Sequence, residues 1–500
     1  MTNSEPAKIQ MEKSKESARS FWLCFAFLLA AVFLFHGKPV PFSNEFVYLP
    51  RLDPYFLPND WTFSQSANEH WLFNFIFGFP ARIISLETIG WLGRIAVWVL
   101  CLHAIIKLGK IWEISYSAIA LGVCVWLASA QAVVNDEWIF GGFEAKTAAY
   151  ACLLGALLGF SKRRIIASAV LLGLSFSFHP AVGLWAIPAV GLALLFEKIP
   201  TIDFVKVVFV TGICSLFGLI ALFDEQTNAA ANSFENWQFI VLYRVPWHLD
   251  LFSFSKLGII LLFAMLIFNR FALRQNKSFA LNFLLNFQLA LAAFFLFGLL
   301  LRWLELYPLL RLMPMRLFPV LTPLFFMFTV FRAVPRFADP RQKTAAALIA
   351  FLMIVLLSPF GKGVAQIRET VRANSSEPDD LQQIARWIAK NTQPDAQIIQ
   401  PPHRRDLWYF SRRAQIVSYG YPTFNRLNQW RERIADLTAN HQIVNGETAA
   451  EEIEKAYNQL SAEQIAAIKQ KYAAQFLVSR ASYPFEVLFE TATYKIYRLP

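Results

Sequence analysis

The sequence predicts a polytopic α-helical membrane protein of about eleven spans with a C-terminal extracytoplasmic α/β domain. Of its 500 residues, 56% are hydrophobic and only 16% are charged, which lies outside the usual composition of soluble domains. Its 49 Phe and 15 Trp are typical of a chain that faces lipid and the lipid–water boundary. Many stretches approach the roughly 20 apolar residues that a helix needs to cross the hydrocarbon core.

The net charge of +11 does not indicate nucleic-acid binding, because most basic residues fall in short loops between apolar runs, where they orient helices. All five cysteines lie inside apolar segments without metal-ligand spacing, so we interpret them as small core residues. The sequence has no HExxH, CxxC or DxD motif, no P-loop and no dinucleotide fingerprint. Nucleotide hydrolysis and redox chemistry therefore have no support.

Hydropathy and charge together predict the spans, which lie near residues 21–35, 86–107, 114–134, 146–160, 165–179, 181–196, 204–223, 251–268, 279–301, 317–332 and 344–360. With the N-terminus in the cytoplasm, the basic clusters fall in the cytoplasmic loops, which is the positive-inside signature of a plasma (inner) membrane protein. Residues 1–20 then form a disordered cytoplasmic tail. No cleavage site follows the first apolar run, so we expect a retained helix rather than a signal peptide.

The charge pattern holds only if residues 70–79 do not span the membrane. This segment is short and rich in Trp and Phe, so we interpret it as an amphipathic helix at the interface. The transmembrane domain then covers residues 21–360 and includes a long first outer loop, 36–85. The odd number of spans places residues 361–500 outside the cytoplasm.

A polar linker, 361–378, is expected to precede a soluble domain at residues 379–500. Alternation of strand-like and helix-like segments predicts a small, mostly parallel sheet with helices packed on it. The expected strands lie near 397–400, 415–419 and 475–479, followed by a closing hairpin around 492–493. The expected helices cover 381–391, 430–437, 449–460 and 462–472.

Nearly every carboxylate, imidazole and isolated arginine of interest falls in a loop on the outer side. Ionisable groups at membrane depth cost roughly 2.5–3.5 kcal/mol each on insertion scales, so their retention predicts one functional site on that face. The candidates are Glu45, Asp53 and Asp60 in the first outer loop, Glu144 and Lys146 in the second, His179 in a later turn, and Arg244, His248, Arg302 and Arg316 farther along.

Several candidates also have a structural alternative. His179, which precedes Pro180, is equally typical of a packed, hydrogen-bonded histidine. Asp60 is well placed to cap a helix, and Asp53, which precedes Pro54, to shape a turn. Glu144 and Lys146 are equally suited to a simple ion pair. It is the cluster, rather than any one residue, that predicts the site.

Several motifs lie along the chain: NEFVYL at 44–49, NDW at 59–61, GGFEAK at 141–146, FHPAVGLW at 178–185, RVPWHL at 244–249, and SRRAQIVSYGYP with NQWRER in the C-terminal domain. With them the chain resembles the GT-C superfamily, and within it an uncharacterised bacterial branch. Members of this superfamily take sugars from polyprenyl-phosphate carriers. One departure is Trp247-His248, where similar sequences tend to have two adjacent histidines. The WWDYG-type signature of oligosaccharyltransferases is missing, which argues against transfer of a whole glycan to asparagine.

The resemblance implies transfer of a hexose or pentose from a polyprenyl-phosphate carrier to an acceptor on the extracytoplasmic face. Such chemistry needs a carboxylate near the membrane surface as general base. The resemblance gives this role to Glu45, because it occupies the acidic position after the first span, with Asp60 and Asp53 as alternatives.

The same resemblance implies cations that stabilise the charge of the leaving phosphate. The implied substrate-binding residues are Arg244 with Arg302 or Arg316, the hydrogen-bonding His248 and His179, and Glu144 with Lys146. A divalent cation, Mg²⁺ or Mn²⁺, would bridge carboxylate and phosphate in such a site, although no tight ligand spacing supports one. The expected partners are the lipid-linked sugar, membrane lipid and, as an open alternative, other membrane proteins of a complex.

Two other functions stay open. One is a catalytically silent relative that serves as a structural or assembly subunit, an alternative that the departure at Trp247 keeps open. The other is a lipid or solute transporter. A transporter favours inverted repeats and mid-helix charges, whereas this chain shows no repeat and carries most charges at helix ends.

Overall fold

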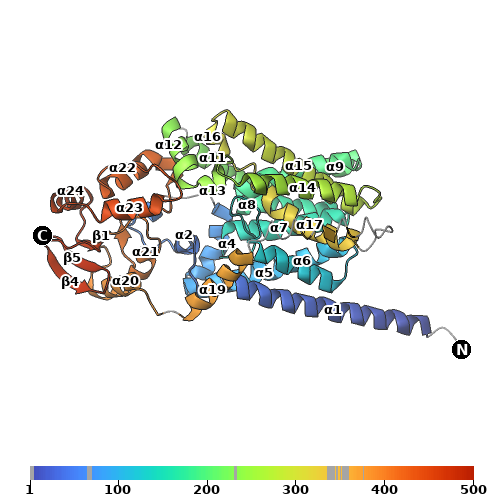
Figure 1. Ribbon diagram of the computed structural model, residues 1–500, viewed down its shortest axis with the longest axis horizontal. Coiled ribbons are helices and arrows are strands. Elements are labelled where there is room, and N and C mark those ends of the chain that lie inside the picture. Colours follow the sequence, from blue (N-terminus) through green and yellow to red (C-terminus); the bar gives the residue numbers. More distant parts are fainter. Residues whose placement is uncertain are drawn as a thin grey trace.

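The computed structural model describes residues 5–64, 70–229, 233–334, 360–375 and 377–500, together with four isolated positions between 344 and 351. The chain forms a helical bundle and a C-terminal domain that packs against one end of it (Figure 1). We call this the outer end of the bundle; the N-terminus lies toward the opposite end. One hydrophobic core contains residues of both parts, among them Phe73 of the bundle and Trp430 of the domain.

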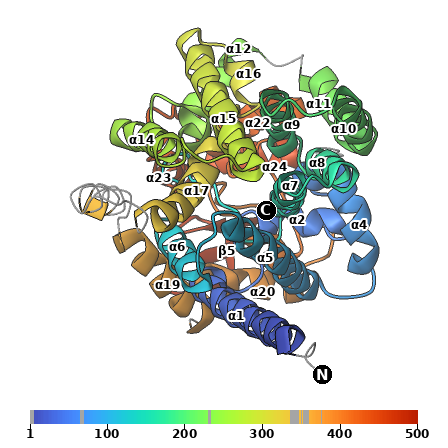
Figure 2. The same cartoon turned by 90° about the vertical axis from the view of Figure 1, so that its right-hand side faces the viewer.

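Ten of the eleven expected spans coincide with helices: α1 (Glu5–His36), α5 (Leu86–Ile111), α6 (Tyr116–Ala128), α7 (Ala145–Ser161), α8 (Ile165–Phe178), α9 (Pro180–Phe196), the pair α10 (Thr201–Cys214) and α11 (Leu216–Ala229), α14 (Lys256–Ala272), α15 (Phe279–Trp303) and α17 (Phe318–Ala333). The eleventh, near 344–360, falls almost entirely outside the described residues. Figure 2 looks along the bundle and shows α7 near its centre, with α1, α10 and α14 at its periphery.

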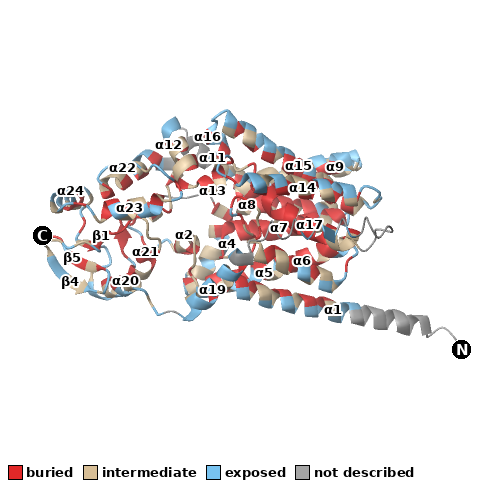
Figure 3. Ribbon diagram, in the orientation of Figure 1, coloured by how far each residue is buried: buried red, intermediate tan, exposed pale blue. Residues whose placement is uncertain are grey.

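Three helical segments of the described chain are long and apolar enough to cross a membrane: Ser17–His36, Leu86–Ile111 and Phe279–Trp303. A fourth joins them if α10 and α11, which are bent by 56° relative to each other, form one span. The other apolar helices are shorter. Figure 3 shows α7 and α17 largely buried, whereas the peripheral helices keep exposed outer surfaces. The chain is therefore a membrane protein in composition and fold, while the count of eleven spans and their orientation stay predictions.

Short helices gather at the outer end, where they face the C-terminal domain (Figure 1). They are α2 (Glu45–Tyr48), η1 (Pro50–Leu52), α3 (Trp61–Ser64), α4 (Trp71–Ala81), α12 (Phe234–Phe239), η3 (Ile240–Arg244), α13 (Pro246–Leu249) and α16 (Tyr307–Leu310). Helix α4 is the segment expected to be a short amphipathic helix. It buries Leu72 and Phe73 and exposes Phe75 and Phe79, so it presents an apolar face outward as well as inward.

Two segments differ from the expectation. The N-terminal tail, expected to be disordered, is helical from Glu5 onward, and α1 continues without a break into the first span. Most of the expected polar linker is helix α19 (Phe360–Ser375), which packs on the outer end of α1. The Thr370 hydroxyl donates to the Phe35 carbonyl at 2.9 Å, and the Asn374 amide donates to the Gly37 carbonyl at 2.9 Å. The polar residues of this segment thus bind helix ends instead of forming a flexible connection.

The C-terminal sheet has the strand order β2-β1-β3-β5-β4. Its strands are β1 (Gln397–Ile399), β2 (Ala414–Gln415), β3 (Phe476–Ser479), β4 (Glu486–Glu490) and β5 (Lys495–Arg498). Strand β1 is parallel to β2 and β3, whereas β5 is antiparallel to β3 and β4, so the sheet is mixed rather than mostly parallel. The closing hairpin causes this difference, because adjacent hairpin strands must run in opposite directions.

The domain helices are α20 (Asp380–Asn391), α21 (Leu407–Ser411), η5 (Phe424–Arg426), α22 (Leu427–Leu437), α23 (Ala449–Tyr457) and α24 (Ala462–Tyr472). Asp379 caps α20 by accepting a hydrogen bond from the Gln382 amide. Strand β2 is shorter than expected and ends at Gln415. The residues that follow it turn toward the bundle, where Tyr421 donates to the Ser43 carbonyl at 2.9 Å.

Hydrogen bonds from the first outer loop hold the domain in place. Asp60 caps α3, since its Oδ1 accepts from the amides of Thr62 (2.8 Å) and Phe63 (3.2 Å). Its Oδ2 accepts from the amide of Gln415 in β2 at 2.9 Å. One buried carboxylate therefore joins the start of a bundle helix to the edge of the domain sheet.

We expect Asp60→Ala to weaken this junction by about 1 kcal/mol or more, the usual loss for a removed helix cap. The Gln415 amide should exchange its hydrogen faster, because its acceptor is gone, and mass-spectrometric hydrogen exchange of the full chain measures this. Asp379→Ala, which removes a cap within the domain only, serves as the control. Equal protection of Gln415 in wild type and Asp60→Ala would show that Asp60 does not secure the domain.

Candidate functional site

A cavity of about 590 Å³ lies between the outer end of the bundle and the C-terminal domain. Loops that are far apart in the sequence contribute to its wall, as does the domain segment from Arg405 to Phe424. Six of the ten candidate residues line it: Glu144, Lys146, His179, Arg244, His248 and Arg316. The outer loops therefore converge on one site, as the distribution of polar residues predicts.

The start of α7 positions two of these side chains. Glu144 is the residue before the helix, and its backbone amide donates to Thr147 Oγ1 at 3.3 Å. Lys146 is the second residue of α7, so its side chain leaves the helix beside Glu144. The N-terminus of a helix carries partial positive charge, which adds to the positive potential of the lysine.

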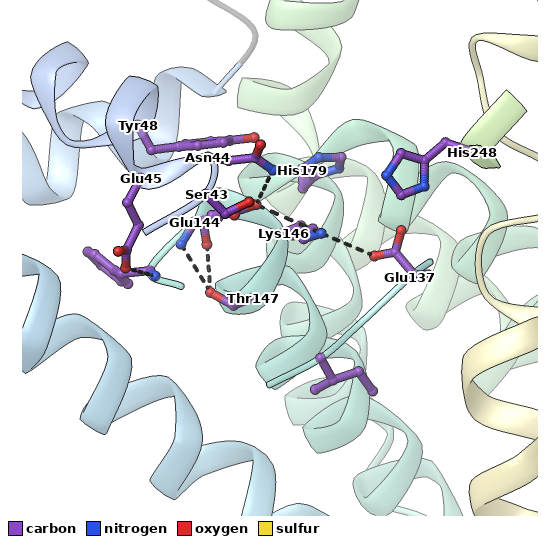
Figure 4. A network of polar contacts seen from close by, with 12 residues as sticks. Ser43, Asn44, Glu45, Tyr48, Glu137, Glu144, Lys146, Thr147, His179 and His248 are labelled. Carbon is purple, nitrogen blue, oxygen red and sulfur yellow. Dashed lines mark hydrogen bonds and ion pairs between the residues drawn. The ribbon is translucent and has the colours of Figure 1, made fainter. Parts of the chain in front are cut away.

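Lys146 stands between two buried carboxylates (Figure 4). Its Nζ lies 3.8 Å from Glu137 Oε1 and 3.8 Å from Glu144 Oε2, and 3.5 Å from the centre of the Trp138 ring. Arg316 Nε donates to the other oxygen of Glu137 at 3.0 Å. Among the described residues, Glu137 Oε1 and Glu144 Oε1 have no hydrogen-bond partner. Each carboxylate thus has one buried oxygen that accepts no hydrogen bond from the described residues.

The two carboxylates differ in protonation. Burial raises the pKa of Glu144 to about 7, although Lys146 and the amide of Asn44 oppose the shift. Burial acts on Glu137 in the same direction, but Arg316 and Lys146 outweigh it and lower the pKa of Glu137 below its usual value. Glu137 is therefore ionised at neutral pH, while Glu144 exchanges a proton there. Such separation of two neighbouring pKa values is typical of sites that divide acid–base roles.

The histidines of the cavity are hydrogen-bonded. His248 Nδ1 lies 2.5 Å from the Asn135 carbonyl oxygen, so it carries the proton and Nε2 is left with a lone pair. Burial lowers the pKa of His248 to about 4, so the ring is neutral at pH 7. His179 stacks on His70 with ring centres 4.9 Å apart, and its Nδ1 lies 3.4 Å from an Arg316 nitrogen. We expect both rings to orient polar ligand groups rather than to carry charge.

Positive charge predominates on the wall. Seven cationic side chains line the cavity, against the two carboxylates of Asp136 and Glu144. The cations are Lys38, Arg51, Lys146, Arg244, Arg311, Arg316 and Arg405. A buried cavity with this excess favours an anionic ligand, and guanidinium groups suit phosphate oxygens in particular.

Glu45 does not line the cavity and is not placed to act as a base. Its Oε1 accepts hydrogen bonds from Arg94 Nε (2.7 Å) and from the Phe143 amide. Its Oε2 accepts from Arg94 Nη2 and from the Phe42 amide (2.8 Å). The carboxylate is fully buried and each oxygen is already doubly occupied, so it has no lone pair free for a substrate proton. In Figure 4 it lies apart from Glu144, Lys146 and Glu137.

The other three candidates also lie elsewhere. Asp53 accepts from the Tyr55 amide at 3.0 Å, which is a turn contact, and Asp60 is the cap described above. Arg302 pairs with Asp250, with 2.6 Å between Nε and Oδ1. For the two aspartates, the structural alternatives named from the sequence describe the observed contacts.

Several residues of the site were not assigned from the sequence. Asn44, Tyr48, Arg51, His70, Arg311, Arg405 and Tyr421 line the cavity, and Glu137 lies behind its wall, paired with Arg316 and Lys146. One signal was available. Asn44 and Tyr48 are four residues apart and flank Glu45, so in a helical turn they share a face that Glu45 does not. Glu137 lies within the visible NDEW segment, but its burial beside Arg316 depends on a contact across the bundle. Nothing local distinguishes Arg405 from the other basic residues of the domain.

No protein-family model matches the sequence, and no curated protein matches it either. The structure, however, is similar to the archaeal oligosaccharyltransferase AglB from Archaeoglobus fulgidus, solved in complex with an inhibitory peptide and a dolichol-phosphate. The TM-score is 0.51 at 12% sequence identity, and the match covers 94% of this chain and 70% of that one. The chain has the GT-C fold.

The coverage means that the likeness includes both the bundle and the C-terminal domain. The fold implied by the resemblance to the GT-C superfamily is thereby confirmed. The assignment to a bacterial branch stays a prediction. So do the identity of the membrane in which the chain resides and the side of that membrane on which the cavity opens.

The contacts of Glu45 predict that its loss harms stability before it harms chemistry. In Glu45→Gln the Arg94 guanidinium stays buried beside a neutral amide, and breaking a buried pair in this way costs about 3–5 kcal/mol. We expect a lower Tm, measured by fluorescence-detected size exclusion after heating. The double variant Glu45→Gln/Arg94→Met should recover part of the loss, because no buried charge is left unpaired. Wild-type stability of Glu45→Gln would contradict the structural role.

Proposed function

We propose that this GT-C chain transfers a sugar from a polyprenyl-phosphate carrier to an acceptor hydroxyl in the cavity beneath its C-terminal domain. One observation carries the proposal. Glu144 is a buried carboxylate with a raised pKa and a free acceptor oxygen, and it stands in a cavity with a large excess of cationic side chains. A base beside an anion-binding wall is what displacement of a phosphate by a hydroxyl requires.

In the proposed reaction the acceptor oxygen attacks the anomeric carbon of the sugar. A new carbon–oxygen bond forms, the bond to the carrier phosphate breaks, and the electron pair leaves with the phosphate. The carboxylate of Glu144 accepts the proton of the attacking hydroxyl. A pKa near 7 suits this role, because the base is then ionised in part at neutral pH and still strong enough to take the proton.

The cations of the wall would hold the phosphate and stabilise its growing charge. Lys146 and Arg316 are the ones tied to the carboxylate pair, so they have fixed positions close to the base. Preorganised cations of this kind need no reorganisation during the reaction. The neutral Nε2 of His248 is suited to accept a hydrogen bond from a sugar hydroxyl.

The proposal predicts that Glu144→Gln lowers the turnover number by about 10²–10⁴-fold, the usual contribution of a general base. The assay uses full-length protein in nanodiscs with a panel of radiolabelled polyprenyl-phosphate hexoses and pentoses, and it measures release of polyprenyl phosphate. Glu451→Gln, at an exposed site on α23, is the matched control and should keep wild-type turnover. Unchanged turnover in a folded Glu144→Gln protein would remove Glu144 from the base role.

The same assay should show a pH dependence that comes from Glu144. The base must be ionised, so turnover should fall about tenfold per pH unit below a pKa near 7 and level off above it. Turnover measured from about pH 5 to about pH 9 tests this. If turnover instead falls only near the ordinary pKa of a glutamate, a solvated carboxylate rather than buried Glu144 takes the proton.

A non-catalytic assembly subunit is the second candidate, and one observation favours it. Trp247 lines the cavity at the position where the resemblance expects a histidine. Absence of phosphate release with every donor, in a protein that still binds polyprenyl phosphate, would favour this candidate. Flux of the lipid or of a solute across proteoliposomes would instead favour a transporter.

A further inference from the structure

The point between Glu137 and Glu144 is where a metal ion would be sought in this cavity. Mg²⁺ and Mn²⁺ prefer carboxylate oxygens, and Mg²⁺ binds them at about 2.0–2.1 Å in octahedral geometry. Two buried carboxylates that flank one point, one of them on the cavity wall, offer such oxygens. The sequence leaves open whether the site holds a divalent cation. The question is therefore whether these residues fit a metal ion.

The residues do not fit one. The Lys146 ammonium lies between the two carboxylates, 3.8 Å from an oxygen of each, where a bridging ion would have to lie. The second oxygen of Glu137 is bonded to Arg316. Across the described chain there is no group of three or more His, Cys, Asp and Glu side chains arranged to hold a metal ion.

Charge opposes a metal as well. Glu137 and Glu144 are matched by Lys146 and Arg316, so the group is close to neutral when both carboxylates are ionised. A divalent cation would have to approach two fixed positive charges in a low-dielectric environment, which is strongly unfavourable. The N-terminus of α7 adds further positive potential at the same place.

The lysine is also held in position. The face of the Trp138 ring covers its ammonium at 3.5 Å, and the two carboxylates flank it, while Lys146 still lines the cavity. The ammonium thus presents N–H donors from a fixed point toward the cavity. A cation with these properties supplies what a bound metal would supply to a phosphate, namely a fixed positive charge beside the base.

We propose that the Lys146 ammonium takes the place of a divalent cation in this site, so that the chain works without a metal. The proposal rests on the transferase function in one respect, because it assigns the ammonium to the phosphate of the lipid carrier. The part that concerns metal binding stands on the contacts alone.

Titration with Mn²⁺, followed by electron paramagnetic resonance, tests metal binding without an activity assay. Full-length wild type in metal-free nanodiscs should show no saturable Mn²⁺ site that depends on Glu144. Lys146→Ala empties the place between the carboxylates and should gain one Mn²⁺ site, and Lys146→Ala/Glu144→Gln should lose it again. Size exclusion confirms that each variant is folded.

Phosphate release then tests the role in transfer. Wild-type turnover should be the same with EDTA as with Mg²⁺ or Mn²⁺. Lys146→Ala should lose about 100-fold or more, as is typical when a charge that stabilises the transition state is removed, and Mn²⁺ should restore part of it. Lys471 of the domain bridges Glu432 and Asp436 at 2.7 Å each on the surface, so Lys471→Ala controls for loss of a bridging lysine and should leave turnover unchanged.

Two results would overturn the proposal: a Mn²⁺ site in wild type that Glu144→Gln removes, or wild-type transfer that EDTA abolishes and Mg²⁺ restores. A folded Lys146→Ala protein that binds no Mn²⁺ would also contradict it, since the carboxylates would then not form an alternative ion site. The wild-type measurements need no variant. If no donor sugar is transferred at all, the proposed function fails, while the Mn²⁺ titration still decides whether the lysine replaces a metal.

Discussion

Burial of charge beneath the C-terminal domain is the constraint on which the rest of the site depends. The domain covers the outer end of the bundle, and its residues form one wall of the cavity. Exclusion of water raises the pKa of Glu144, keeps His248 neutral and strengthens the attraction between Glu137 and its two cations. The domain is therefore part of the site, although most of the polar residues belong to the bundle.

The Glu45–Arg94 pair extends this dependence to the geometry of the base. Glu45 accepts from the Phe143 amide, which directly precedes Glu144 in the chain. At Gly142 an added Cβ would lie 3.0 Å from the Glu45 carboxyl carbon, so a larger residue there would require the carboxylate to shift. Arg94 in turn donates to the Lys38 carbonyl at the end of the first helix. A buried ion pair thus fixes the segment that carries Glu144. Under the proposed function, Glu45 positions the base instead of acting as one.

The sequence predicts those features that depend on residues close together in the chain, and it misses those that depend on contacts between distant residues. Apolar runs locate the bundle helices because helix formation there depends on local hydropathy. Convergence of the outer loops on one cavity follows from topology, and the structure agrees with it. The role of Glu45 could not be found in this way, because its partner Arg94 lies 49 residues away inside an apolar helix. The role of Glu137 could not be found for the same reason, because its partner Arg316 is 179 residues away. The sequence predicts a linker at 361–378 because this segment is polar. No local pattern reveals that Thr370 and Asn374 bind backbone carbonyls at the end of α1.

Arg244 shows how the position of the domain and the binding of an anion depend on each other. Its Nε donates to the Tyr419 carbonyl at 2.6 Å, and its Nη2 donates to the Gly420 carbonyl. Two nitrogens of the guanidinium are therefore hydrogen-bonded to the domain, while the side chain also lines the cavity. A phosphate that pulled the guanidinium away from the domain would have to compete with both carbonyls. A phosphate that bound the remaining Nη1 would instead leave both of these hydrogen bonds in place. The second arrangement holds the domain closed over the ligand, because the same cation is then bonded on both sides. Under the proposed function Arg244 is accordingly a link between domain and ligand, whereas Lys146 and Arg316 are held in place by Glu137 and Glu144 of the bundle.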